Sequence, residues 1–171
     1  MARTRDLDEG ALAAIRALVD LAFAGDFDDH DWAHALGGVH ALIEIDGATV
    51  GHASVVPRSF WLDDQPLRCG YVEAVAVHPH HRRRGLGWRL MGAMEALIAG
   101  TDDLGALSAS EAGAALYARR GWLPWRGPLG CRTDLGVMPS RGDEGVFVFP
   151  VGAPPDPRAR LVCDWRPGDV W

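Results

Sequence analysis

The apolar residues of the chain follow two spacings, one typical of helices and one typical of strands. Over residues 6–24 they recur every three or four positions behind an acidic start, which predicts a helix. The acidic polar stretch 25–32 follows and is interpreted as a connection. Three strands are predicted next, at 39–45, 48–62 and 67–77, separated by turn-forming Asp-Gly and Asp-Asp-Gln-Pro sequences.

The second half of the chain continues with alternating helices and strands. A helix is predicted over 86–100, where apolar residues share one face, and a short buried strand over 104–109. A further helix has Ser110 as its predicted N-cap and ends at Gly121 after two arginines. The segment 125–145 is rich in Gly and Pro and is predicted to be a long loop. Two short strands complete the pattern, at 145–151 and 160–165.

This order of elements predicts the fold class. Antiparallel hairpins come first, and a strand–helix–strand–helix unit follows, so an α/β fold with a mixed sheet is expected. A chain of 171 residues is long enough to bury its own core, and we expect one domain over 1–171.

Composition and charge narrow the classes of partner. The apolar content is 48% and the charged content 23%, as in ordinary globular proteins, and the formal net charge is −6. The acidic balance argues against nucleic acid and suits a small cationic ligand. No apolar run reaches the roughly 18 residues of a membrane span. The N-terminus has no apolar segment of the kind found in signal peptides, so a cytoplasmic location is expected.

Neither the cysteines nor the histidines form a metal-binding pattern. Cys69, Cys131 and Cys163 are far apart and are expected to be reduced thiols. A histidine cluster spans 78–81, but the arginines beside it would repel a cation and no second cluster is near in sequence. We therefore expect no metal.

The stretch VEAVAVHPHHRRRGLG, residues 72–87, combines features of an anion site. A strand leads into a loop, and a helix begins near Leu86, where unpaired backbone N–H groups point outward. Gly85 and Gly87 allow a ligand to approach the main chain closely. Three arginines at 82–84 add positive charge, which favours a phosphate or pyrophosphate. The spacing matches neither a Walker loop nor a GxGxxG loop.

The same stretch resembles the (Q/R)xxGx(G/A) loop of the GNAT acyl-CoA N-acetyltransferases. Arg82, Gly85 and Gly87 take the three motif positions, and Val75-Ala76-Val77 resembles the end of the preceding strand. The resemblance implies the GNAT fold, a mixed, mostly antiparallel twisted sheet flanked by helices, and acetyl-CoA as acetyl donor. It also implies a set of cofactor-binding residues: Val75, Val77, Arg82, Arg83, Arg84, Gly85, Leu86 and Gly87.

Further stretches resemble one branch of that family, the aminoglycoside 2′-N-acetyltransferases. They are AFAGDF, GGVHALI, LRCGYVEAVAV, LGALSAS, LYARRGWLPW and CDWRPGDVW. The resemblance implies a polycationic aminoglycoside as acceptor, for which carboxylates are suitable partners. It assigns substrate contacts to Asp26, Glu73, Ala74, Ser108, Asp143, Asp169 and the terminal carboxylate of Trp171. Around Asp143 the match is weak, and Glu144 is an alternative there.

The resemblance also implies a mechanism of direct transfer in a ternary complex. Glu73 is the expected base, acting through a water, and Tyr117 the expected acid for the departing thiolate. The backbone N–H of Val75 is placed to polarise the thioester carbonyl. The alternatives are a structural ion pair for Glu73 and a core position for Tyr117. None of the three cysteines matches a nucleophile position of the family.

Two other functions stay open on the sequence. One is transfer to a different amine, such as a polyamine, another amino sugar or a protein amine. The other is a non-catalytic acyl-CoA-binding module on the same fold. The resemblance implies a homodimer, for which the tryptophan-rich stretch GWLPW offers an apolar interface, although the same tryptophans are equally suited to internal packing.

Overall fold

The structure, a computed structural model, describes residues 1–140 and 145–171 and divides into two compact units. Unit 1 comprises Met1–Val56 and Val72–Leu97, and unit 2 comprises Pro57–Tyr71 and Ile98–Trp171. Two long strands, β3 (Ala48–Leu62) and β4 (Gln65–Val77), contribute residues to both units, as does helix α3 (Leu86–Thr101). The assignment of the chain to a single domain stays a prediction.

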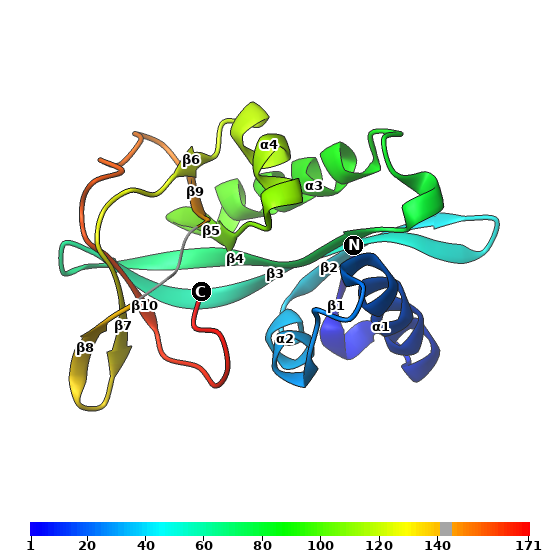
Figure 1. The fold of residues 1–171 in the computed structure, drawn as a ribbon, viewed down its shortest axis with the longest axis horizontal. Coiled ribbons are helices and arrows are strands. Elements are labelled where there is room, and N and C mark those ends of the chain that lie inside the picture. The colour runs from blue at the N-terminus through cyan, green and yellow to red at the C-terminus, as the bar shows by residue number, and fades with distance from the viewer. Residues whose placement is uncertain (141–144) are drawn as a thin grey trace. The chain divides into compact units, whose positions relative to one another are not determined.

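Unit 1 is built from two helices, four strand segments and the first part of α3. Its remaining elements are β1 (Ala2–Arg3), a 3-10 turn (Thr4–Asp6), α1 (Glu9–Phe23), α2 (Asp29–Ala35), β2 (Val39–Ile45) and a second 3-10 turn (Pro79–His81). Strand β2 pairs antiparallel with both β1 and β3, and Ala41 lies opposite Ala53. Within this unit α1 and α2 cover one face of the strands and α3 lies on the other (Figure 1).

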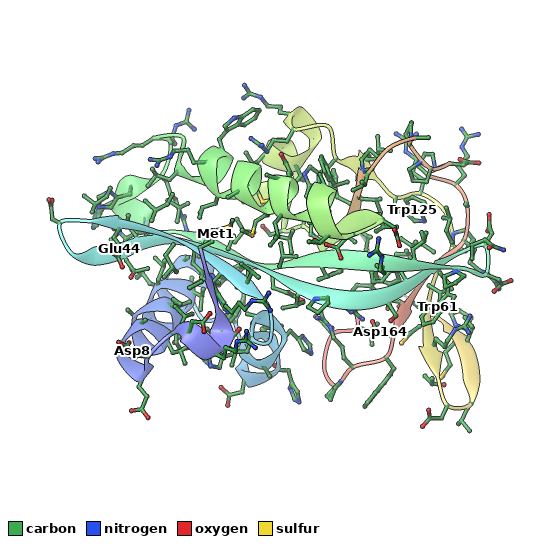
Figure 2. The ribbon with its side chains drawn as sticks, turned by 180° about the vertical axis from the view of Figure 1, so that it is seen from behind. Met1, Asp8, Glu44, Trp61, Trp125 and Asp164 are labelled. Carbon is green, nitrogen blue, oxygen red and sulfur yellow. The ribbon has the colours of Figure 1, made fainter. Side chains whose placement is uncertain are left out.

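The core of unit 1 forms where α1 meets β4. The apolar stripe of α1 buries Ile15, Leu18 and Val19 against Ala74 and Ala76 of β4. Small residues on the strand allow the helix to approach closely. The helix begins at Glu9, three residues later than the predicted start, because the carboxylate of Asp8, labelled in Figure 2, caps it by accepting a hydrogen bond from the N–H of Ala11 at 2.7 Å.

Unit 2 contains the strand order β6-β9-β5-β4-β3-β10-β7-β8. Its further elements are β5 (Leu104–Ser108), α4 (Glu111–Arg119), β6 (Leu123–Pro124), β7 (Leu129–Thr133), β8 (Gly136–Pro139), β9 (Val146–Pro150) and β10 (Leu161–Asp164). The pairs β4–β5 and β7–β10 are parallel, and β5–β9, β6–β9, β3–β10 and β7–β8 are antiparallel. The predicted mixed, mostly antiparallel sheet is therefore confirmed.

Two predictions about local structure are wrong. The stretch 25–32 is not merely a connection, because α2 begins at Asp29 behind a capping box formed by Asp28 and Asp31. The segment 125–145 is not a loop throughout, since β7 and β8 form a hairpin there. Trp122 of GWLPW is 1% exposed and packs on Phe149, so this tryptophan serves the core of unit 2. Within the described parts of the chain, every helix is too short or too polar to span a membrane.

Candidate active site

The backbone of β4 is irregular at Glu73–Ala74, a segment called here the bulge of β4, where the first group of predicted site residues lies. Ala74 lies in the left-handed region, with φ of +50°, in the middle of the strand. Two side chains of β3 face the carbonyls at this point. The contact between His52 Nδ1 and the Ala74 oxygen is 2.8 Å, and the Ser54 hydroxyl donates to the Glu73 oxygen at 3.5 Å. The left-handed conformation of Ala74 therefore changes the direction in which the side chains of Glu73, Ala74 and Val75 extend from the strand.

The arginine–glycine loop follows the end of β4 and leads into α3. Arg83 has φ of +61° and Gly85 has φ of +76°, so the chain turns sharply before the helix begins at Leu86. The N–H of Arg89 donates to the Gly85 oxygen at 3.1 Å, which is the first hydrogen bond of the helix. The amides of the first turn, including those of Leu86 and Gly87, precede that bond and have no acceptor within the helix.

The three arginines of this loop have different surroundings. Arg82 donates to the carbonyl of Val77 at 3.3 Å and to that of Ala22 at 2.9 Å, so its guanidinium joins the end of β4 to the last turn of α1. Arg83 and Arg84 are exposed. Among the described atoms, none lies within 4 Å of a Cβ built on Gly85. The exposed arginines, the open space and the helix start are together suited to an anionic ligand.

Asp26 lies in the turn between α1 and α2, close in sequence to the carbonyl that Arg82 binds. Helix α1 ends with Ala24 at φ +56°, and the N–H of Asp26 donates to the Phe23 oxygen at 3.1 Å. Arg16 contacts Asp29 at 3.0 Å and so ties the start of α2 to α1. The Asp26 carboxylate is exposed, as a contact for a cationic ligand requires.

Tyr117 belongs to unit 2 and lies on α4. It is 7% exposed, with the rings of Trp122 and Phe147 each 6.1 Å away between centroids. Gly113, one turn earlier, leaves room for the phenol ring, since a Cβ there would lie 3.0 Å from it. Burial raises the pKa of Tyr117 to about 12, so the phenol holds its proton at neutral pH and is able to donate it.

Ser108 is at the end of β5, opposite Val146 of β9, and its side chain is exposed. The predicted substrate residue Asp143 and its alternative Glu144 lie outside the described residues.

The C-terminal segment after β10 folds back onto β3 within unit 2 (Figure 1). Arg58, which is 7% exposed, holds this segment by donating to the Asp164 carboxylate at 2.8 Å and to the backbone oxygens of Asp164 and Val170 at 2.6 and 2.7 Å. Trp171 is 6% exposed and its ring meets Phe60 edge-on at 5.5 Å. The carboxylate of Asp169 is exposed.

A cavity of about 550 Å³ adjoins this segment in unit 2. The β7–β8 hairpin lines it with Cys131 and Met138, and the C-terminal segment lines it with Trp165 and Val170. Ser140, on the same wall, accepts a hydrogen bond from the indole N–H of Trp171 at 3.1 Å. The β7–β8 hairpin, in a segment for which the sequence predicts a loop, therefore contributes to the surroundings of Trp171.

Sequence reasoning missed the side chains that hold these segments in place. His40, His52 and Ser54 are fully buried on strands that were identified only as strands, and Arg58 was assigned no role. Histidines within apolar strands were the available signal, because a buried polar side chain requires a partner. The three predicted thiols are buried, and burial raises the pKa of Cys69 and Cys163, the latter to about 12.

The histidines of the arginine loop contact one another. His78 and His80 have ring centroids 5.4 Å apart, and Nδ1 of His78 accepts from the N–H of His80 at 3.3 Å. Over residues 1–140 and 145–171, no group of three or more His, Cys, Asp or Glu side chains is arranged to hold a metal ion.

Comparison with known proteins places the chain among acetyltransferases. The model of the family described as "Acetyltransferase (GNAT) family" matches residues 12–122. The chain is 48% identical over 176 residues to an aminoglycoside 2′-N-acetyltransferase of Mycolicibacterium fortuitum, covering 100% of this chain and 90% of that protein.

Solved structures show a similar fold. A GNAT family acetyltransferase from Brucella melitensis, in complex with acetyl-CoA, is 16% identical with a TM-score of 0.59 over 91% of this chain and 90% of that one. Eis1 from Mycobacterium abscessus is 22% identical with a TM-score of 0.60 over 70% of this chain, which spans 31% of Eis1. At these identities the likeness concerns the fold alone, and it confirms the predicted fold class.

Proposed function

The chain belongs to the GNAT family of acetyltransferases, and on that basis we propose that it transfers the acetyl group of acetyl-CoA to the 2′-amino group of aminoglycoside antibiotics. The observation that carries this proposal is the 48% identity, along the whole chain, to the enzyme of M. fortuitum that is named for this reaction. Acetylation removes a positive charge from the antibiotic, and we propose aminoglycoside resistance as the consequence.

The loop before α3 supports the binding of acetyl-CoA. Its pyrophosphate requires amide donors, positive charge and space, and these are present at the first turn of α3, at Arg83 and Arg84, and above Gly85. We assign the thioester arm to Val75 and Val77, which follow the bulge of β4. Arg82 contributes by fixing the loop, since its guanidinium is hydrogen-bonded to two carbonyls.

The exposed carboxylates of Asp26 and Asp169 support a cationic acceptor. An ammonium group forms strong, charge-assisted hydrogen bonds with a carboxylate. We assign further acceptor contacts to Ala74, Ser108 and the C-terminal residue Trp171, and the buried indole of Trp171 fixes the position of that residue.

The proposed chemistry is a direct displacement. Glu73 accepts a proton from the 2′-ammonium group through a water, and the neutral amine forms a C–N bond with the acetyl carbonyl carbon. The nitrogen then releases a second proton to water as the C–S bond breaks. Tyr117 donates its proton to the departing thiolate, and the phenol is protonated at neutral pH because burial raises its pKa to about 12. The N–H of Val75 stabilises the negative charge on the carbonyl oxygen. Buried cysteines with raised pKa values support transfer without an acetyl-enzyme.

We also propose that the chain forms a homodimer. In unit 2 the side chains of Leu135, Met138 and Trp165 are 96%, 55% and 59% exposed, and this apolar surface supports an interface better than the buried Trp122 does.

The test is thiol release from acetyl-CoA with two acceptors, one aminoglycoside bearing a 2′-amine and a close analogue bearing a 2′-hydroxyl. Release with the amine alone is the expected result. Release with both would retain the acetyltransferase and overturn the 2′ assignment. Release with neither would favour another amine or a non-catalytic acyl-CoA-binding module, and calorimetry with CoA would then test whether the arginine–glycine loop binds the cofactor.

A further inference from the structure

Four residues of unit 1 form a continuous, mostly buried chain of hydrogen bonds that ends at the bulge of β4. The Thr4 hydroxyl lies 2.8 Å from Nε2 of His40, and Nδ1 of His40 lies 2.9 Å from Nε2 of His52. Nδ1 of His52 in turn lies 2.8 Å from the oxygen of Ala74. Both histidines are 0% exposed. The mechanism proposed above uses none of these histidine contacts, so their role is open.

The contact between His52 and the Ala74 carbonyl determines where the protons lie along this chain of hydrogen bonds. A carbonyl only accepts, so Nδ1 of His52 carries a proton and donates it to Ala74. In a neutral His52 ring Nε2 is then an acceptor, and Nδ1 of His40 donates to it. The Thr4 hydroxyl lies 2.8 Å from Nε2 of His40 and 3.3 Å from the Gly38 oxygen, so its one proton is assigned to the shorter contact, in which Nε2 of His40 accepts. The Thr4 oxygen receives the N–H of Gly37 at 2.9 Å. Each ring therefore holds the Nδ1–H tautomer.

Burial supports the neutral form of both rings. It lowers the pKa of His52 to about 4 and also lowers the pKa of His40. A proton relay to the reaction is excluded by the chemistry of the chain's inner end, because a backbone carbonyl does not take up a proton at neutral pH. What the chain delivers to the bulge is a directed hydrogen bond.

That hydrogen bond acts where the strand is least regular. Ala74 holds a φ of +50°, a strained conformation for a non-glycine residue. At the bulge His52 and Ser54 supply side-chain donors to two successive carbonyls, those of Ala74 and Glu73. The position of His52 itself is fixed by His40, and that of His40 by Thr4.

We propose that His52 is a positioning residue for acetyl transfer, which holds the Glu73–Ala74 bulge so that Glu73 and the N–H of Val75 keep their reactive directions. This inference rests on the proposed function for the roles of Glu73 and Val75. His40 supports this role by holding His52, and Thr4 supports it by holding His40.

Three substitutions of His52 separate positioning from simple packing. The side-chain amide of Asn places a donor near the position of Nδ1, whereas that of Gln places one near Nε2. We expect His52→Gln and His52→Phe to lower kcat about ten- to a hundredfold, since small misplacements of reacting groups cost that much. We expect His52→Asn to retain most of kcat, and KM for the acceptor to change little in all three.

The matched control is Val55→Ala, a cavity-forming change on the same strand at a residue 5% exposed. It lowers stability without touching the hydrogen-bond chain, and kcat should stay at the wild-type level. If His52→Gln and His52→Asn both behaved like Val55→Ala, or if Asn lost as much kcat as Gln, the positioning role would be overturned. The kinetics use whichever amine the wild type acetylates, so a wrong 2′ assignment leaves this test intact.

A second measurement does not depend on turnover. Nitrogen-15 NMR of the histidine rings reports the tautomer, and both His40 and His52 should show Nδ1–H with an unprotonated Nε2 at pH 7. His52→Gln should also shift the amide signals of residues 73–75, while Val55→Ala should not. An Nε2–H tautomer or a charged ring at His52 would overturn the chain as described.

Discussion

His52 in unit 1 and Arg58 in unit 2 each hold a backbone segment that carries predicted site residues, and they do so in different charge states. His52 is neutral and fully buried and donates one hydrogen bond to one carbonyl, that of Ala74. Arg58 is cationic, is 7% exposed, and spans three acceptors between Asp164 and Val170. Neutral His52 fixes the backbone at one position in β4. Cationic Arg58 holds the C-terminal segment at several positions, and its charge is balanced by the Asp164 carboxylate.

The difference indicates what each region contributes. The bulge of β4 carries the proposed base, whose orientation must be fixed, and a single short hydrogen bond from the rigid His52 ring fixes the backbone there. A terminal segment needs to be kept from fraying, and several strong bonds from one guanidinium supply that. We therefore expect changes near the bulge to act on kcat, and changes near Arg58 to act on stability and on binding of the acceptor.

The largest effect is expected for Glu73→Gln. Loss of a general base lowers kcat by about 10² to 10⁴, and raising the pH should restore part of the rate because the substrate amine then loses its proton unaided. Stopped assays of thiol release over a pH series measure both. The exposed Glu9, also in unit 1, provides the control, and Glu9→Gln should leave kcat unchanged. A Glu73→Gln enzyme with wild-type kcat would contradict the assignment of Glu73 as the general base.

Arg58→Met should have the next largest effect, on stability. The change removes the guanidinium donors of the Asp164 carboxylate and of two carbonyls. Longer contacts from Ser59 and Cys163 remain at Asp164 and Val170. We expect a loss of about 2–4 kcal/mol in the free energy of unfolding, since Asp164 is partly exposed. Urea denaturation measures it. Arg68→Met, which breaks an exposed pair with Asp103 in the same unit, should cost less than about 1 kcal/mol. Equal losses in the two variants would contradict the fastening role of Arg58.

The charge states themselves predict a difference in pH dependence. The pKa of His52 is about 4 in the folded protein and near 6.5 when unfolded, so the unfolded state binds more protons between these values. Stability is complete above about pH 6.5 and falls as the pH drops towards 4, by at most about 1.4 kcal/mol per pH unit for this group. Urea denaturation between about pH 7 and 5 should show this slope, and His52→Gln should flatten it.

Arg58 stays charged throughout that range, so Arg58→Met should lower stability by a similar amount at each pH. A slope that disappears in Arg58→Met and persists in His52→Gln would reverse the comparison.

The smallest effect is expected for Asp169→Asn. The exposed carboxylate forms no part of the fold's interior, and its loss should raise KM for the aminoglycoside about tenfold with little change in kcat or in unfolding free energy. Steady-state kinetics with a 2′-amino acceptor measure this. Asp156→Asn removes another exposed carboxylate of unit 2 and should leave KM as it was. A fall in kcat without a change in KM would assign Asp169 a role in the chemical step rather than in binding the acceptor.

Much of the secondary structure follows from the sequence alone, because it depends on neighbours within one or two turns. The strands at 39–45 and 48–62 were predicted with the bounds that the structure shows, and α1 begins behind its cap at Asp8. The arginine–glycine loop before α3 is also predictable from the sequence, since a helix start, two glycines and three arginines are local features. By contrast α2 was missed, although its capping box of Asp28 and Asp31 was a local signal.

The tertiary structure alone decided which side chains hold the site in shape. The β7–β8 hairpin depends on pairing with β10, which lies some thirty residues along the chain from β7, and composition gives no sign of it. The left-handed Ala74 depends on a donor 22 residues away, and the C-terminal segment depends on Arg58, 106 residues from Asp164. Local sequence indicates which residues are candidates for the chemistry. Contacts between distant strands determine how the backbone that carries these residues is held, because a buried polar group is stable only where folding brings its partner.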